Sequence, residues 1–170
     1  LAISSAASDV YKRQKKHHLR KMIRTHKCNQ IGIDSVGQEV SVTGWVHRRR
    51  DHGGVIFLDI RDENGMVQVV YNPEFKEAFS LAESCRNEYV IFSKGVVRER
   101  PEGTINDNLE TGKIEVVASD LLILNSSLPM PFQLDEYTSV GEDTRLKYRF
   151  LDLRRSDMQE NLRLRSKVSA

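Results

Sequence analysis

The sequence predicts an all-β fold with one helix. Five stretches alternate apolar and polar residues, which is typical of half-buried strands, and one stretch carries apolar residues at helical spacing. The helical stretch lies between the third and the fourth strand. This order is that of a five-stranded Greek-key barrel of the OB-fold type, in which strands 2 and 3 and the flanking loops bind oligonucleotides.

The first three strands are expected in the first half of the chain. Glu39–His47 alternates with valines on one side, and Val55–Asp62 carries isoleucine, leucine and isoleucine on one face. Met66–Tyr71 forms the third strand. The intervening Glu63-Asn64-Gly65 predicts a type I′ hairpin turn, because Asn and Gly tolerate the positive φ angles that this turn requires.

The helix is expected to begin at Asn72-Pro73, with Asn as the cap and Pro at the first helical position. Its expected buried stripe consists of Phe75, Ala78, Phe79, Ala82 and Cys85. Glu88–Arg100 is the fourth strand, and Ile114–Leu124 is the fifth, with an interruption near Ser119-Asp120. The polar loop 101–113 joins them.

The composition changes after the fifth strand. Asn125–Asp143 is rich in Ser, Pro and Gly and is interpreted as an ordered linker. Arg145–Arg155, RLKYRFLDLRR, combines cations with apolar residues, and Ser156 with Gln159 has the spacing of a helix capping box. The expected helix continues to Ala170. The expected organisation is therefore a barrel over 22–125, a linker over 126–144 and the start of a second, truncated domain over 145–170.

The start of the sequence is treated separately. Ser4–Gln14, SSAASDVYKRQ, matches a one-frame translation of a transposase adapter used in DNA sequencing libraries. Residues 1–14 are therefore expected to be an assembly artefact, and Lys15–Lys21 to be upstream read-through before a natural start at Met22. We call residues 1–21 the leader. The leader holds six Lys or Arg residues and one acid. The remainder has 20 basic and 23 acidic residues, a net charge of −3 in place of +2. The basic charge is therefore no argument for a nucleic-acid partner.

Composition also argues against several classes of protein. No apolar run approaches the roughly 20 residues of a membrane helix, and no signal-peptide pattern is present. Cys28 and Cys85 lack metal-ligand spacing and are interpreted as reduced thiols of a cytoplasmic protein. His17 and His18 fall in the leader, so no metal site is expected.

Phe57 is the first candidate for a binding residue. In Val55–Asp62 it shares the polar face with Asp59 and Arg61, just after three consecutive arginines at positions 48–50. A ring on an open strand beside cations suits a single-stranded nucleic acid, because bases stack on the ring and phosphates bind the cations. The alternative is that Phe57 packs under a loop or another domain.

Two blocks, GWVHRRRDHGGVIFLDIRDENGMVQVV and RLKYRFLDLRR, resemble the N-terminal part of bacterial-type aspartyl-tRNA synthetases. The resemblance implies an anticodon-binding OB domain, a hinge and the entry to a class II α/β catalytic domain. It also implies that the full-length protein is a homodimer that uses ATP and Mg²⁺. Its catalytic site would lie beyond Ala170, so this chain alone is expected to hold no catalytic residue or cofactor and to be inactive.

The resemblance also assigns roles on the barrel surface. Phe57 falls where the family stacks the middle anticodon base, and Gln68, expected to point outward, falls where an amide reads that base. Arg50 corresponds to the arginine of the loop between the first two strands that holds anticodon bases or their backbone.

Further positions are less specific. Arg98 and Arg100, expected on one side of their strand, resemble arginines near the anticodon. Glu115 resembles an acidic residue near the first anticodon base. Plainer roles remain open: solvated or structural side chains for Arg48 and Arg49, and cross-strand pairs for Asp59, Arg61 and Asp62.

Two residues bear on tRNA choice. His52 and Gly103 resemble the non-discriminating members of the family, which charge both tRNA-Asp and tRNA-Asn. Their two anticodons differ only at the third base, so loops near that base could set tolerance. The plain alternatives are an exposed loop histidine and a turn glycine that needs positive φ.

Two other functions remain open. One is a free-standing OB module that binds single strands with little base preference and strong salt dependence. The other is a related synthetase for asparagine or lysine, which the RRRD-x-GG string and RLKYRFLDLRR disfavour.

Overall fold

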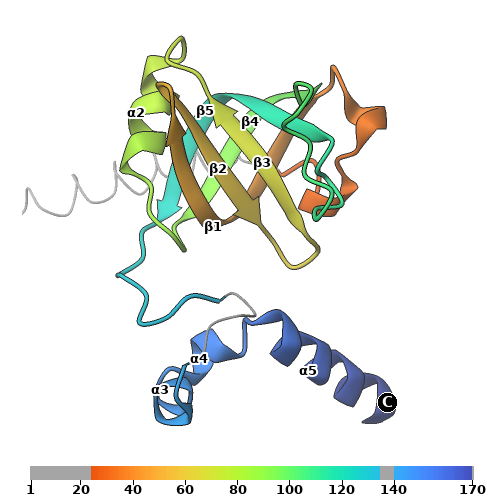
Figure 1. Cartoon of the computed structure of the whole chain (residues 1–170), viewed down its shortest axis with the longest axis vertical. Coiled ribbons are helices and arrows are strands. Elements are labelled where there is room, and N and C mark those ends of the chain that lie inside the picture. Colours follow the sequence, from red (N-terminus) through yellow and green to blue (C-terminus); the bar gives the residue numbers. More distant parts are fainter. Residues whose placement is uncertain (1–23, 135–139, 170) are drawn as a thin grey trace, which may run out of the picture. The chain divides into compact units, whose positions relative to one another are not determined.

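The computed structural model describes residues 24–134 and 140–169, which belong to two compact units divided between Leu128 and Pro129 (Figure 1). The expected leader, residues 1–21, and the expected start at Met22 lie outside the described residues. The first unit contains the strands. The second contains helices α3–α5.

The strands of the first unit close into a barrel in the order β1-β2-β3-β5-β4, and β1 also pairs with β4. Neighbouring strands are antiparallel except β3 and β5, which are parallel. The predicted fold class, a five-stranded OB-type barrel followed by helices, is confirmed. The strands are β1 (Glu39–His52), β2 (Val55–Arg61), β3 (Met66–Tyr71), β4 (Val90–Glu99) and β5 (Ile114–Asn125).

The core of the barrel includes the alternate residues of β2 that the sequence predicted. Ile56, Leu58 and Ile60 of β2 are fully buried, as are Val67, Val69 and Tyr71 of β3. The Tyr71 hydroxyl donates to the Ser93 hydroxyl at 2.8 Å, which satisfies the one polar group of that ring inside the barrel. Burial of each large apolar side chain contributes about 1.5–3 kcal/mol to folding.

Helix α2 (Lys76–Ser84) lies beside the strands (Figure 1) and begins later than predicted. The Asn72 carbonyl accepts from the Phe75 amide in a turn, and Phe75 is the cap residue with a non-helical backbone. Ala78 and Ala82 enter the core as predicted, whereas Phe75 is exposed. Cys85 is buried just after the last helical residue.

The predicted type I′ turn at Asn64-Gly65 is wrong. The Asp62 carboxylate accepts from the amides of Asn64 and Gly65 at 2.8 and 3.1 Å, a side-chain turn that needs no positive φ. The glycine pair Gly53-Gly54 instead has φ angles of +61° and +79° and joins β1 directly to β2. Strand β1 therefore runs to His52 and not only to His47.

Strand β5 carries the irregularity expected near Ser119-Asp120. Lys94 pairs with Asp120 and Gly95 pairs with Ala118, so Ser119 has no partner residue across β4. This arrangement is a β-bulge, which bends the strand and increases its twist. The backbones of β4 and β5 approach each other closely at Gly95, where an added Cβ would lie 2.2 Å from the Val117 carbonyl oxygen.

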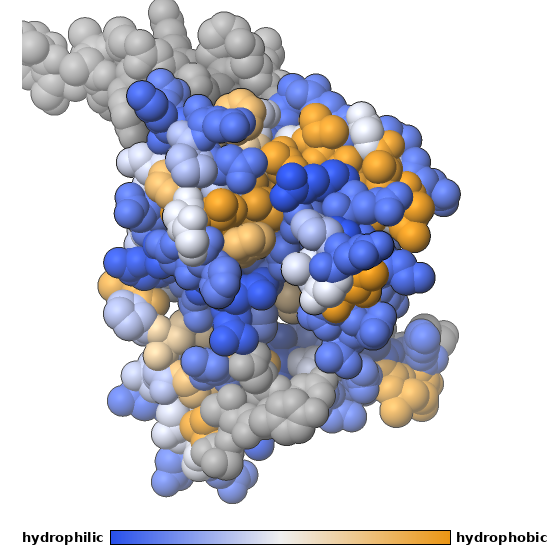
Figure 2. All heavy atoms as spheres, turned by 45° about the horizontal axis from the view of Figure 1, so that its top comes forward, coloured by the Kyte–Doolittle hydropathy of each residue, from blue (hydrophilic) through white to orange (hydrophobic). Residues whose placement is uncertain are grey.

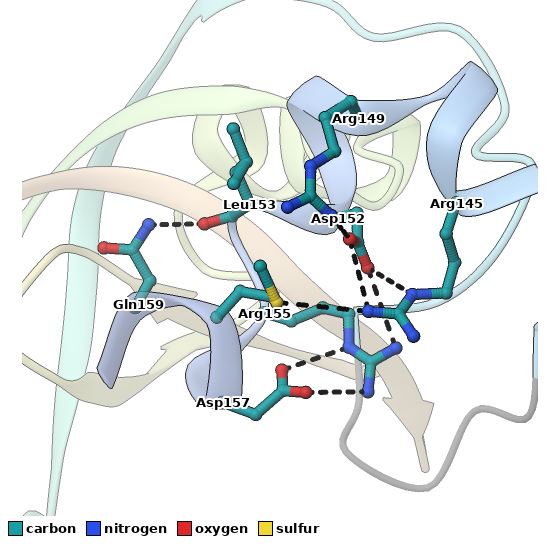
Figure 3. Close-up of polar contacts among 8 residues, drawn as sticks. Arg145, Arg149, Asp152, Leu153, Arg155, Asp157 and Gln159 are labelled. Carbon is teal, nitrogen blue, oxygen red and sulfur yellow. Dashed lines mark hydrogen bonds and ion pairs between the residues drawn. The ribbon is translucent and has the colours of Figure 1, made fainter. Parts of the chain in front are cut away.

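The second unit contains α3 (Glu142–Lys147), α4 (Arg149–Asp152) and α5 (Ser156–Ser169). Helix α3 begins inside the segment expected to be linker. Asp152 is fully buried and is surrounded by the guanidinium groups of Arg145, Arg149 and Arg155 (Figure 3). The pKa of the Asp152 carboxyl is below its usual value, mainly because of the hydrogen bond from Arg145. Burial of the carboxyl acts in the opposite direction.

One face of the molecule is largely hydrophilic, and its hydrophobic side chains form separate patches (Figure 2).

Of the helices in the described part of the chain, none combines the length and the apolar character needed to span a bilayer.

Candidate nucleic-acid interface

A β-bulge in β1 places Arg48 and Arg50 on the outer face of the barrel. Val46 pairs with Ile60 and Arg48 pairs with Asp59, so His47 is the extra residue on β1. Strict alternation from the buried Val46 would place positions 48 and 50 on the core side. The extra residue reverses this, and Arg48 and Arg50 share the outer face of the barrel with Asp59.

Phe57 lies on the same outer face and is partly exposed. It is directly opposite Val70 on β3 and Arg50 on β1, so Arg50 belongs to a strand and not to the loop in which it was expected. The Arg50 guanidinium carbon is 6.0 Å from the centre of the Phe57 ring, within range of a cation–π interaction. Because the ring is partly exposed on the outside of the barrel, it is accessible to a stacking base.

A continuous chain of hydrogen bonds crosses this face. The Arg50 Nη2 group donates to Asp59 Oδ1 at 2.7 Å and to Gln68 Oε1 at 3.0 Å. Gln68 Nε2 donates to Glu115 Oε2 at 2.9 Å, and Arg98 Nε donates to Glu115 Oε1 at 2.7 Å. We call Asp59, Arg50, Gln68, Glu115 and Arg98 the outer-face network. It takes residues from all five strands of the barrel.

The carboxylates of this network are more buried than its guanidinium groups. The side chains of Glu115 and Asp59 are 3% and 11% exposed, whereas those of Arg50 and Arg98 are 44% and 48% exposed. The carboxylates therefore lie beneath the guanidinium groups. A surface of this kind presents cations to solvent and holds them in place from below, which suits phosphate and base-edge contacts.

Arg100 lies one residue beyond β4 and is only 8% exposed. Its Nε donates to the Ile114 carbonyl at 2.9 Å and its Nη1 to the Thr104 carbonyl at 3.4 Å. Its Nη2 is buried and has no hydrogen-bond partner in the described part of the chain. Burial lowers the pKa of this guanidinium, and the nearby Glu115 and Asp59 carboxylates act in the opposite direction.

The structure places the two residues expected to affect tRNA choice near turns. His52 is the last residue of β1 and pairs with Val55, so it belongs to a strand and not to a loop as expected, and it is exposed. Gly103 has a φ of +81°, in a turn that the Thr104 amide closes on the Pro101 carbonyl at 3.1 Å. The interpretation of Gly103 as a turn glycine with positive φ is therefore right for its conformation.

Of the three residues for which cross-strand pairs were considered, only Asp59 forms one in the described part of the chain, with Arg50. Arg61 pairs instead with Glu88, which precedes β4, at 2.5 Å. Asp62 accepts from the Cys28 amide at 2.9 Å, in addition to its turn. The sequence did not indicate that Asp59 joins the same network as Gln68. Only the register Asp59↔Gln68 between β2 and β3 shows this.

Across residues 24–134 and 140–169, no three His, Cys, Asp or Glu side chains gather as a metal site would require.

Comparison with known proteins agrees with this geometry. Residues 40–124 match the family model for tRNA anticodon domains, described as an OB-fold nucleic-acid-binding domain. The chain is 57% identical over 148 residues to an aspartate–tRNA(Asp/Asn) ligase of Magnetococcus marinus. The match covers 86% of this chain and 24% of that relative, so the chain spans about a quarter of its length.

Solved structures show the same architecture. An asparaginyl-tRNA synthetase of Pyrococcus horikoshii, in complex with asparaginyl-adenylate, is 26% identical with a TM-score of 0.67, covering 78% of this chain and 29% of that one. An aspartyl-tRNA synthetase of Entamoeba histolytica has a TM-score of 0.75 at 18% identity, covering 86% and 35%. The second likeness concerns the fold alone.

Proposed function

This chain belongs to the OB-fold nucleic-acid-binding family of tRNA anticodon domains, and on that premise we propose that its barrel binds the anticodon loop of a tRNA. The observation that carries the proposal is the partly exposed Phe57 ring beside the Arg50 guanidinium, on the face of strands β1–β3. A base stacked on Phe57 would lie between an apolar surface and a fixed cation. Stacking of this kind is worth about 1–3 kcal/mol per base.

Gln68 is the proposed reader of the middle base. It lies next to Asp59 on the adjacent strand, two residues from Val70, which is the partner of Phe57. The residue is on the outer face of the barrel as expected, but it is buried, with 6% exposure. Its amide uses one oxygen lone pair and one N–H in the outer-face network, and a base edge would have to reach the remaining lone pair and N–H. Uridine offers both a carbonyl acceptor and an N–H donor, so a single amide can satisfy it.

Phosphates are the proposed partners of the exposed arginines. Arg50 and Arg98 are each engaged on one side by a carboxylate and leave other N–H groups toward solvent. Arg100 was also expected near the anticodon, but it is buried, and its bonds to the Ile114 and Thr104 carbonyls favour a role in holding the turn at Thr104. Glu115 has both oxygens engaged, so a contact with the first anticodon base would require one of these bonds to open.

The parent protein is proposed to be an aspartate–tRNA ligase that joins aspartate to tRNA-Asp with the use of ATP. The 57% identity to a ligase of this name supports the proposal. The same name includes tRNA-Asn, so dual charging through His52 and Gly103 is proposed with it. A homodimer in the cytoplasm is the assembly and location that the family resemblance implies.

The test is binding of the 170-residue chain to fluorescent anticodon stem-loops that differ only at the middle base. The expected result is tightest binding to the loop with uridine, and a salt dependence that follows the number of phosphates contacted. Equal binding of all four loops would instead support a generic single-strand module. A second set of loops, with the anticodons of tRNA-Asn and tRNA-Lys, tests the related synthetases. Tighter binding to one of these loops than to the aspartate loop would support that family.

A further inference from the structure

The Gln68 side chain is held from two sides by groups of opposite charge. Its oxygen accepts from the Arg50 guanidinium, and its nitrogen donates to the Glu115 carboxylate. A rotation of the amide by 180° would place N–H groups against the guanidinium and oxygen against the carboxylate. Both contacts would then be repulsive, so the network selects one orientation of the amide.

This orientation determines what a base would meet. A freely rotating amide presents donor and acceptor in either order and discriminates poorly between uridine and cytidine, whose hydrogen-bonding edges have opposite patterns. A fixed amide presents one order only. Discrimination at this position therefore depends on the groups that hold Gln68, as well as on Gln68 itself.

Asp59 controls one of those groups. The same nitrogen of Arg50, Nη2, donates one hydrogen to Asp59 Oδ1 at 2.7 Å and the other to Gln68 Oε1 at 3.0 Å. The Arg50 side chain is otherwise 44% exposed and long, and such side chains lose considerable rotamer freedom when they are fixed. The buried Asp59 carboxylate is the contact that keeps this nitrogen over Gln68.

We propose that Asp59 is a positioning residue for base recognition, which acts through Arg50 to fix the donor and acceptor order of the Gln68 amide. The proposal rests on the proposed anticodon-binding function. Asp59 does not need to touch RNA, because it acts through its hydrogen bond to the Arg50 guanidinium, whose side chain is 44% exposed.

The first experiment compares the 170-residue chain with its Asp59→Ala and Asp59→Asn variants. The measured quantity is the ratio of dissociation constants for stem-loops with cytidine and with uridine at the middle position. Asp59→Ala is expected to lower this ratio about three- to tenfold, the effect of one hydrogen bond. Asp59→Asn retains an oxygen acceptor and should keep part of the preference.

A matched control separates positioning from stability. Glu88→Gln weakens the buried Arg61–Glu88 pair of the same barrel without touching the outer-face network. It should lower the midpoint of thermal unfolding and leave the cytidine-to-uridine ratio unchanged within twofold. If Glu88→Gln changes the ratio as much as Asp59→Ala, the effect of Asp59 is merely structural and the proposal is overturned.

A double-mutant cycle tests the route through Gln68. In a Gln68→Ala background, Asp59→Ala should have no further effect on the ratio, because the amide that it positions is absent. Additive losses would contradict the proposal. A second readout needs no RNA: the side-chain NH₂ resonances of Gln68 in ¹⁵N spectra should broaden or shift in Asp59→Ala and remain unchanged in Glu88→Gln.

The outcomes distinguish the two proposals. A wild-type chain that binds all four loops equally overturns both the anticodon function and the positioning role. A wild-type preference for uridine that Asp59→Ala leaves intact supports the function and overturns the role of Asp59.

Discussion

Arg50 lies directly opposite Phe57 in the register of β1 and β2, with its guanidinium carbon 6.0 Å from the centre of the ring. A cation and an aromatic surface are thus fixed side by side on the outside of the barrel. The pairing depends on the bulge at His47, which shifts Arg50 onto this face. The site is therefore a product of strand register as much as of residue type.

Phe57→Ala should weaken binding of the uridine stem-loop by about 1–3 kcal/mol, because one base loses its stacking surface. Anisotropy titrations at fixed salt measure the change. Phe57→Leu is the control, since it keeps an apolar side chain over Val70 and removes the ring. If Phe57→Leu binds as well as the wild type, the residue contributes packing and not stacking.

His52→Leu with Gly103→Asn should lower charging of tRNA-Asn more than charging of tRNA-Asp in a full-length enzyme rebuilt from this sequence. A difference of about 1–3 kcal/mol, or ten- to hundredfold in selectivity, is expected for polar discrimination at one base. Asn is the appropriate replacement at Gly103, because it tolerates the left-handed backbone with φ of +81° better than other side chains do. The measurement is kcat/KM for each of the two tRNAs. A parallel loss of both activities would mean that these residues only support the turns.

Gly95→Ala should destabilise the barrel by about 1–3 kcal/mol, the usual cost of forcing an extra carbon into a packed site. The added Cβ would lie 2.2 Å from the Val117 carbonyl oxygen and 2.7 Å from the Ala118 Cα, which are backbone atoms that cannot turn aside. Urea unfolding measures the change. Gly32→Ala is the control, since no atom lies within 4 Å of its added Cβ, and equal losses in both variants would exclude this explanation.

Stability should fall as the pH rises above about 9, because both buried thiols resist ionisation in the folded state. Burial is the main cause, raising the pKa of Cys28 to about 12 and that of Cys85 to about 11, from 9.0. The unfolded chain then releases protons that the folded chain keeps. Below pH 9 both states are protonated, and the thiols add no pH dependence.

The measurement is urea unfolding at pH 8 and pH 10.5 for the wild type and for Cys28→Ala/Cys85→Ala. Each thiol should account for about 1–2 kcal/mol of the loss between these pH values. The double variant should therefore lose less on going to pH 10.5. An identical loss would assign the effect to other groups, such as lysines or tyrosines.

Hydrogen exchange should show lower protection in Glu142–Ser169 than in the barrel strands, because these helices contain few buried apolar side chains. Asp152→Asn should raise exchange further in α3 and α4, since it weakens the bonds from Arg145 and Arg149 (Figure 3). Barrel amides serve as the internal control. Equal protection in both units would contradict the expectation, as would a change confined to the barrel.

The sequence by itself determined the order of the barrel strands and their helix, and the buried face of β2. Period-2 alternation identified Ile56, Leu58 and Ile60 as buried, and the order of strands and helix identified the OB-type barrel. These features follow from local hydrophobic pattern, which is written directly in the chain. The outward aromatic Phe57 was predictable for the same reason.

Only the tertiary structure decided how the polar residues combine. The bulge at His47 depends on pairing with β2, and local alternation would have turned Arg50 inward. Gln68 and Glu115 are 47 positions apart and meet only because β3 and β5 pair in parallel. Asp62 likewise replaced the predicted Asn-Gly turn with a side-chain turn. Hydrogen bonds between distant strands depend on register, and register is set by closure of the whole barrel.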